Sequence, residues 1–294
     1  MISRRLALAA FLAPPHRLPK HACDTHTHIF GDPRRFPFFP GRAYTPPTAL
    51  PHEMSALHRR LGIDRVVIVT PSVYGTDNSA TLFGLRARGS SARGIAVIDD
   101  TTPTSTLNQL ARSRFCGARL NLGAAASGPE SARRSVERLF DRVSGLRWHL
   151  QLFAGLKVVA ALEDLLARAP IPVCIDHVAG ALPDLGLFQP GFDALLRLLA
   201  SGKTYVKITN RFLPSGQPQA TAAMVAALHQ ANPNRILWGT DWPHPDNRSL
   251  PGRKPTDISP FEPVDDLLWL NRFLALTNDP ARTHVANPAT LYGF

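Results

Sequence analysis

Hydrophobic runs alternate along this chain with stretches in which apolar residues recur every three or four positions. The runs are short and often β-branched, which is typical of strands. We expect strands near residues 23–30, 65–72, 94–99, 117–122, 148–153, 173–177, 205–210 and 236–241. The periodic stretches predict helices over residues 52–61, 78–88, 104–113, 130–144, 156–167, 192–200 and 219–231, with a last helical region from 264 to 273 and beyond.

Strands that alternate with helices of this length predict right-handed crossover connections and a parallel sheet. Eight such units in about 270 residues match the size of a (β/α)8 TIM barrel. A doubly wound open sheet is the alternative, but no predicted strand is followed by a G-x-G-x-x-G phosphate loop. We therefore predict one α/β barrel domain over residues 21–294, after a Pro-rich lead-in over residues 1–20.

Two polar runs lie where predicted strands end, Asp24–His28 near the start of the chain and Gly239–His244 near its end. His26 and His28 are alternate residues of one strand and therefore share a face. A His-X-His pair by itself is just as often two surface or packing histidines. The aspartate in the second run, Asp241, favours an enzyme, because paired imidazoles and a carboxylate are suited to activating water.

Strand parity extends this candidate site, because alternate residues of a barrel strand face the interior. Counted from the strand tips, the inward set is mostly polar: Asp24, His26, His28, Ile68, Thr70, Ser72, Arg119, Asn121, His149, Gln151, Phe153, His177, Lys207, Thr209, Arg211 and Asp241. The opposite set is apolar: Val67, Val69, Leu120, Leu150, Leu152 and Val206. Buried polar groups cost free energy unless they are paired or solvated, so this pattern indicates a wet, functional cavity.

Composition narrows the class of protein. The 294 residues are 44% hydrophobic, as in a globular protein, and no apolar stretch approaches the ~20 residues of a membrane span. The net charge of +11 comes mostly from arginine, which binds carboxylates in a bidentate fork, so an anionic substrate is expected. Most arginines are read as a solvated surface, and no basic cluster indicates nucleic-acid binding.

Cysteine usage and the first residues bear on the compartment. Three cysteines without C-x-x-C spacing argue against a disulfide framework and against a structural zinc site. Ser3–Arg5 before the apolar run 6–13 resembles a twin-arginine export leader. The run is short and lacks a clean cleavage site, so a cytoplasmic protein is the favoured interpretation.

Four segments together resemble the amidohydrolase superfamily: Asp24–His28, Ile175–His177, Gly239–His244 and Asn287–Phe294. The resemblance extends from Ala22 to the end of the chain. Two further segments, Gly41–Pro46 and Thr70–Asn78, are similar to the 2-pyrone-4,6-dicarboxylate lactonase group, which includes sugar-lactone and muconolactone hydrolases.

The resemblance implies a distorted TIM barrel whose site lies at the carboxyl ends of the strands. It implies that Asp241 is the general base, which takes a proton from the attacking water. It also implies that His26, His28 and His177 surround the scissile carbonyl and either polarise it or hold a metal. The positions implied to orient substrate carboxylates are Arg119, Arg211, Tyr44 and Ser72.

Two positions depart from the lactonase pattern. A second arginine is expected just after Arg119, where this chain has Ala124–Ala126, with Ala125 among them, and a tyrosine is expected at Phe153. Hydrogen bonds to charged groups are worth roughly 1.5–3 kcal/mol each, so these losses predict an altered substrate. The exact substrate and the oligomeric state are left open.

Metal content is also left open. Binuclear members need a lysine or glutamate on the fourth strand and a histidine on the fifth. This chain has Arg119 and Asn121 on the fourth strand, and on the fifth it has His149, Gln151 and Phe153, with an apolar residue at the tip. A guanidinium would also repel a divalent cation. We therefore expect either no metal or one weakly held zinc, whose four ligands would be His26, His28, His177 and Asp241.

The leading prediction is a hydrolase that uses Asp-activated water to open a carboxylated lactone. Such a lactone would resemble 2-pyrone-4,6-dicarboxylate, a muconolactone or a sugar-acid lactone. A metal-dependent decarboxylase of aromatic acids in the same superfamily is one alternative. A catalytically silent barrel that only binds its ligand is the other.

Overall fold

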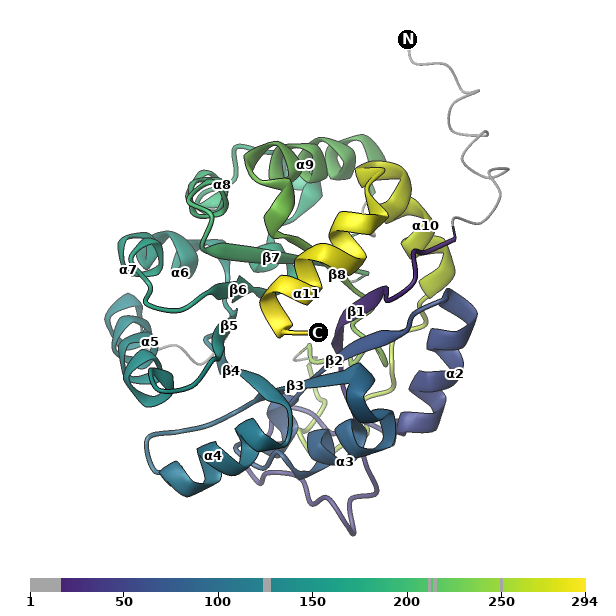
Figure 1. Cartoon of the computed structure of the whole chain (residues 1–294), viewed down its shortest axis with the longest axis vertical. Coiled ribbons are helices and arrows are strands. Elements are labelled where there is room, and N and C mark those ends of the chain that lie inside the picture. Colours follow the sequence, from purple (N-terminus) through teal and green to yellow (C-terminus); the bar gives the residue numbers. More distant parts are fainter. Residues whose placement is uncertain (1–16, 124–127, 211–212, 214–215, 249–250) are drawn as a thin grey trace.

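Eight parallel strands form one sheet in which each strand pairs with the next along the chain, as Figure 1 shows. The structure is a computed structural model, which describes residues 17–123, 128–210, 213, 216–248 and 251–294. The strands are β1 (Cys23–Thr27), β2 (Arg65–Val69), β3 (Ala92–Ala96), β4 (Phe115–Asn121), β5 (His149–Phe153), β6 (Val173–Ile175), β7 (Thr204–Thr209) and β8 (Ile236–Gly239). This order confirms the predicted barrel and excludes the doubly wound alternative.

The sheet closes where the residues after β8 meet β1. The Asp241 backbone N–H donates to the His26 carbonyl oxygen at 2.9 Å, and the His28 N–H donates to the Trp242 carbonyl oxygen at 2.8 Å. The two polar runs found in the sequence are therefore neighbours in space, although more than 200 residues separate them.

Helices surround the barrel, as the sequence periodicity predicts (Figure 1). They are α2 (Pro51–Leu61), α3 (Ser79–Arg88), α4 (Thr104–Arg112), α5 (Pro129–Val143), α6 (Leu156–Ala161), α7 (Glu163–Ala167), α8 (Phe192–Ala200), α9 (Pro218–Ala231), α10 (Asp266–Thr277) and α11 (Asn287–Tyr292). The single helix expected over 156–167 is wrong, because the chain leaves helical geometry at Leu162. None of the described helices is long and apolar enough to cross a membrane. Most of the lead-in, including the twin-arginine-like run, lies outside the described residues.

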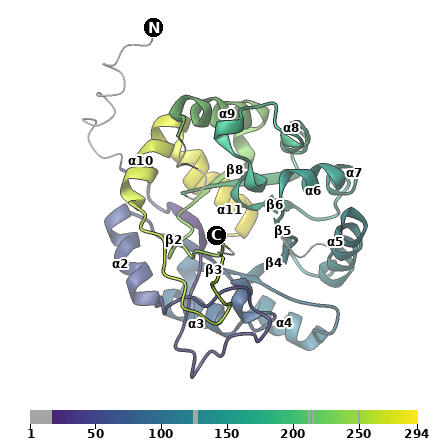
Figure 2. The ribbon, with the colours of Figure 1, turned by 180° about the vertical axis from the view of Figure 1, so that it is seen from behind.

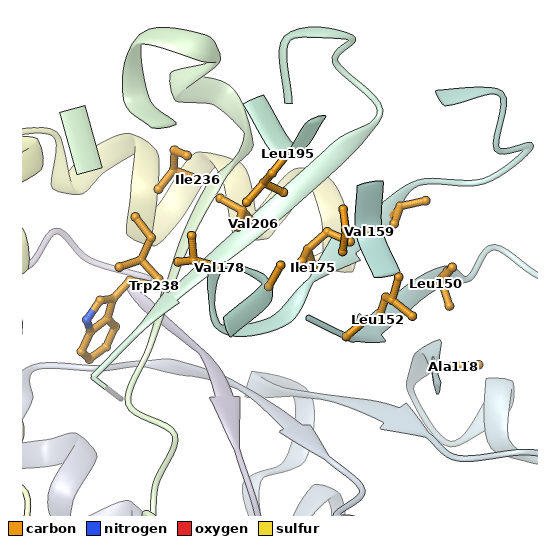
Figure 3. Packing of buried hydrophobic residues seen from close by; sticks show 14 of the residues in the cluster. Ala118, Leu150, Leu152, Val159, Ile175, Val178, Leu195, Val206, Ile236 and Trp238 are labelled. Atoms are coloured by element: carbon orange, nitrogen blue, oxygen red, sulfur yellow. The ribbon is translucent and has the colours of Figure 1, made fainter. Parts of the chain in front are cut away.

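The main core lies between the strands and the helices. Figure 3 shows Leu150, Leu152, Ile175 and Val206 from the strands packed in the same layer as helix residues such as Leu195. Burying this apolar surface is the dominant favourable term in folding. Leu150, Leu152 and Val206 therefore face outward, as parity predicts, and β4, β5 and β7 turn Arg119, Gln151 and Lys207 inward.

The inward and outward faces predicted from strand parity are wrong for β2 and for Asp24. Val67 and Val69 pack inside the barrel against Tyr292 of α11, which crosses the amino-terminal end of the barrel in Figure 1. Thr70 instead contacts Thr81 of α3. The pairing of β1 with β2 shifts register between Asp24 and Thr27, so Asp24 turns outward. A single bulge of this kind reverses which residues face the interior.

Two long loops cover the carboxyl ends of the strands and lie side by side in Figure 2. One follows β1 and the other follows β8. They are joined where the Ser259 backbone N–H donates to the Thr45 carbonyl oxygen at 2.8 Å and the Thr45 hydroxyl donates to Pro255. Loops at this end of a TIM barrel form the walls of its functional site.

Candidate active site

The two histidines of the first polar run project from β1 and from the residue just after it. His26 is fully buried and His28 nearly so. The His28 Nδ1 atom lies 2.8 Å from the Val69 carbonyl oxygen. A carbonyl can only accept, so Nδ1 carries the proton, and the Nε2 atom of a neutral His28 faces the site with its lone pair.

Asp241 lies two residues beyond the end of β8, where the chain turns with φ of 64°. Aspartate tolerates this left-handed conformation better than most residues. The turn brings the Asp241 Oδ1 atom to 3.6 Å from His26 Nε2 and to 3.5 Å from His28 Nε2. The predicted base and the predicted imidazoles therefore meet at one point.

His177 follows β6 on a strained turn in which His177, Val178 and Ala179 all have φ between 50° and 54°. A left-handed conformation costs about 1–2 kcal/mol for each such residue, so the surrounding fold must impose it. The turn places His177 Nδ1 2.7 Å from the Thr209 hydroxyl and the ring 4.7 Å from that of His26. Strain of this kind concentrates at functional sites.

Beneath these groups lies a buried polar network centred on Asp176. Its Oδ2 atom accepts from Arg119 Nε at 3.1 Å and from Gln151 Nε2 at 3.0 Å. Its Oδ1 atom lies 3.3 Å from His26 Nδ1 and 3.5 Å from Lys207 Nζ. Side chains from four other strands therefore converge on one carboxylate.

A second carboxylate, Asp24, joins β1 to the end of β8. It accepts from the Thr240 N–H at 3.0 Å, from the Thr240 hydroxyl at 2.6 Å and from the His26 N–H at 3.1 Å. His58 of α2, which is fully buried, lies 3.2 Å away on the outer side. Asp24 thus fixes the two polar runs relative to each other without entering the site.

Gly239 allows this close approach. A Cβ atom at this position would lie 2.8 Å from the His26 backbone nitrogen and from its Cβ. We expect Gly239→Ala to destabilise the fold by about 1–3 kcal/mol and to reduce activity, because β8 must move away from His26. Denaturant unfolding and a rate assay would measure both, with Gly145→Ala as control because nothing lies within 4 Å of its added Cβ. Equal effects of the two substitutions would contradict this account.

A small pocket opens above the network, and most of the predicted substrate-binding residues line it. Its lining is His28, Tyr44, Pro71, Ser72, Arg119, Asn121, Phe153, His177, Asp241, Pro245 and Asn247. Arg211 and Ala125 lie outside the described residues, so their predicted roles stay predictions. His26 lies below the pocket floor, behind His28 and Asp241.

Electrostatics favour an ionised Asp241 and a neutral His26. Burial raises the pKa of Asp241, but His177, His28 and His26 outweigh it and hold that pKa well below its usual range. Burial, assisted by Lys207 and His177, lowers the pKa of His26 well below 6.5 despite the opposing charge of Asp176. Burial also raises the pKa of Asp176, but Lys207, His26 and Arg119 reverse that effect and lower it strongly.

The residues present fit one metal ion. The ligand atoms of His26, His28 and Asp241 lie within 4.8 Å of one another. Within the described residues, His26 Nε2 is a buried nitrogen without a hydrogen-bond partner. Tetrahedral zinc with bonds of about 2.0–2.1 Å separates its ligands by about 3.4 Å, close to the distances found here. His177, the fourth predicted ligand, belongs to a second set of possible ligand atoms, which it forms with His26 and Asp176.

The sequence did not reveal the roles of Asp176, Lys207 and Asn247. Parity had placed Lys207 and Gln151 inside the barrel, which was a usable signal. Asp176 follows the last residue of β6 and lies on a turn, so strand parity does not apply to it. Asn247 belongs to the loop after β8, whose path no periodic pattern predicts.

Known proteins resemble this chain over most of its length. A 4-sulfomuconolactone hydrolase from Rhizobium radiobacter is 33% identical over 287 residues, which cover 94% of this chain and 91% of that protein. A Pseudomonas putida structure described as a 2-pyrone-4,6-dicarboxylic acid hydrolase has a TM-score of 0.76 at 26% identity and covers 94% of this chain and 98% of that one.

A more distant neighbour carries a metal. It is a Burkholderia multivorans amidohydrolase with bound zinc, which has a TM-score of 0.60 at 16% identity over 92% of this chain and 96% of that one. The sequence model of the amidohydrolase family itself matches residues 23–294. The chain therefore belongs to the amidohydrolase family.

Proposed function

We propose that this protein is a hydrolase that opens the lactone ring of a small anionic molecule, with Asp241 as general base. One observation carries the proposal: the Asp241 carboxylate faces the imidazoles of His26 and His28 at the floor of a pocket that His177 and Arg119 also line. Two of the relatives described above are named as hydrolases of a sulfomuconolactone and of a pyrone dicarboxylic acid, and such anionic substrates agree with a guanidinium in the pocket.

In the proposed reaction a water molecule attacks the lactone carbonyl carbon while Asp241 takes one of its protons. The ring C–O bond then breaks, and the same proton passes from Asp241 to the departing ring oxygen. The surrounding imidazoles keep Asp241 ionised, so it is ready to accept that proton at neutral pH. Asp241 ends each cycle as a carboxylate.

Negative charge develops on the carbonyl oxygen during the attack, and His177 is placed to stabilise it. Removing one such donor typically slows an enzyme by about 10²–10³-fold. A zinc ion held by His26, His28 and Asp241 would supply Lewis-acid polarisation at the same place. Thr209 fixes the His177 ring from behind through its hydroxyl at 2.7 Å.

Substrate orientation is assigned to Arg119, Tyr44 and Ser72, with Arg211 proposed from the sequence alone. Arg119 donates a hydrogen bond from its Nε atom to the Asp176 carboxylate. Its remaining guanidinium N–H groups are therefore the ones proposed to bind a carboxylate or sulfonate of the substrate. Asn121 and Asn247 add amide groups to the same pocket.

A spectrophotometric assay of purified protein tests the proposal. The substrates are 2-pyrone-4,6-dicarboxylate, 4-sulfomuconolactone and an uncharged lactone of similar size, each with added zinc and with a chelator. We expect turnover of at least one anionic lactone and little turnover of the uncharged one. Release of carbon dioxide from an aromatic acid, without ring opening of any lactone, would refute the proposal.

Phe153 offers a sharper test of specificity. It lines the pocket beside His177 and Arg119, where the lactonase pattern has tyrosine. We expect Phe153→Tyr to lower KM for the dicarboxylate by about tenfold, because the new phenol adds a charge-assisted hydrogen bond. Phe188→Tyr is the matched control, since Phe188 is fully exposed. A KM that stays the same in steady-state assays would place the second carboxylate elsewhere.

A further inference from the structure

Lys207 is a fully buried lysine that the proposed reaction does not use. It projects from β7 into the barrel interior, and its ammonium donates to Gln151 Oε1 at 2.7 Å. Removing an ammonium from water costs several kcal/mol unless it is paired and hydrogen-bonded. The network around Asp176 supplies the pairing, and it places Lys207 beside the one imidazole that lies deepest in the site.

The Nδ1 atom of His26 faces a donor and an acceptor at almost equal distance. Lys207 Nζ, which can only donate, lies 3.4 Å away. Asp176 Oδ1, which as a carboxylate can only accept, lies 3.3 Å away. A neutral imidazole carries one proton, so Nδ1 either accepts from Lys207 or donates to Asp176.

The two choices have opposite consequences at Nε2, on the other side of the ring. If Lys207 donates to Nδ1, then Nε2 carries the proton and points it at Asp241 Oδ1, 3.6 Å away. If Nδ1 donates to Asp176, then Nε2 presents a lone pair to that carboxylate. Two electron-rich atoms that face each other repel, and a cation placed between them relieves that repulsion.

The charges of the buried site agree with an Nε2 proton in the absence of metal and a bare Nε2 in its presence. In the described part of the buried site, Lys207 and Arg119 balance Asp176 and Asp241 when the histidines are neutral. A divalent cation adds two positive charges to that balanced set. Among the described residues these charges therefore sum to zero before any cation is added, with Arg211, which lies outside them, not counted.

We propose that Lys207 sets the tautomer of His26, and that this tautomer decides whether the site works without metal or holds zinc. In the metal-free protein Lys207 donates to Nδ1, and the Nε2 proton is directed at Asp241. In the zinc-loaded protein Nδ1 donates to Asp176, and Nε2 is free to bind the ion. The inference rests on the proposed function only in taking His26 and Asp241 as parts of the hydrolytic site.

Nitrogen NMR of 15N-histidine-labelled protein tests the first half without any substitution in the site. Imidazole nitrogen shifts distinguish the two tautomers, and a His26→Gln sample assigns the signal. In chelator-treated wild type we expect His26 to be protonated at Nε2, and after zinc is added we expect protonation at Nδ1. An Nδ1-protonated His26 in the metal-free wild type would overturn the proposal, whether or not any lactone is turned over.

Lys207→Met tests the second half, with Lys203→Met as matched control. Lys203 is the other lysine near β7, and its ammonium donates to the Ala169 carbonyl oxygen at the opposite end of the strand from the site. In Lys207→Met we expect the metal-free His26 to become Nδ1-protonated, because Asp176 is the closer carboxylate and has lost the cation facing its Oδ1 atom. We also expect the Kd for zinc to fall at least tenfold, as measured by competition with a chromogenic chelator.

A purely structural role for Lys207 predicts something different. Lys207→Met would then lower the unfolding temperature while leaving the His26 tautomer and the Kd for zinc as they are in wild type, and that result would overturn the proposal. If Lys207→Met does not fold, the wild-type measurements still decide the first half. Failure of the proposed function would be seen separately, as absence of lactone turnover with an unchanged NMR result.

Discussion

Asp241→Asn is expected to lower kcat for lactone opening by about 1,000-fold or more, with KM changed little. Asparagine keeps the size and shape of the side chain but cannot take a proton from water. General base catalysis is worth about 10²–10⁴-fold, and loss of the base leaves only the binding and charge-stabilising groups. Steady-state assays of the substrate found in the screen would measure both constants.

Asp193→Asn provides the control for this prediction. Asp193 is an exposed carboxylate on α8, paired with Arg197 and remote from the pocket lining. Its loss should leave kcat as in wild type. Circular dichroism and the unfolding midpoint would show that Asp241→Asn is folded. A folded Asp241→Asn protein with kcat near that of wild type would remove Asp241 as the base.

Asp176→Asn is expected to reduce the free energy of unfolding by about 3–5 kcal/mol. The substitution keeps the shape of the side chain but leaves the buried cations Lys207 and Arg119 without a carboxylate between them. Breaking a buried ion pair by removing one partner leaves a charge that neither water nor protein compensates. Urea denaturation followed by tryptophan fluorescence would measure the loss.

Asp164→Asn is a matched control, because Asp164 also bonds two arginines but lies at the surface. Its partners are Arg133 and Arg168, and about half of its side chain is exposed. Exposed ion pairs contribute about 0–1 kcal/mol, so we expect a small effect. If Asp164→Asn cost as much as Asp176→Asn, burial would not explain the importance of the network around Asp176.

The barrel and most of its site could be predicted from the residues themselves. Eight apolar runs separated by helical periodicity lead to a parallel barrel, because βαβ crossovers have one hand and one usual length. His26, His28 and Asp241 were recognisable because each lies next to a strong strand signal. Parity also placed Arg119, Gln151 and Lys207 inside the barrel correctly, since their strands are regular.

Prediction failed wherever the chain leaves regular geometry. Seven of the eight strands end one to three residues earlier than their apolar runs suggest, so His177 and Asp241 lie on turns with positive φ. At Asp24 the inward and outward faces are exchanged by a register shift in β1, a local backbone event that hydrophobic patterning does not record. On β2 they are exchanged because parity was counted from Ser72, which lies beyond the end of the strand at Val69.

The barrel and the end at which its polar side chains gather therefore follow from periodicity and strand order alone, and the candidate roles of those side chains follow from the family resemblance. The positions of two carboxylates needed the folded structure: Asp176 lies among Arg119, Gln151, His26 and Lys207, and Asp24 joins the first strand to the last. Such contacts depend on distances between side chains far apart in the chain, and those distances exist only once the barrel has closed.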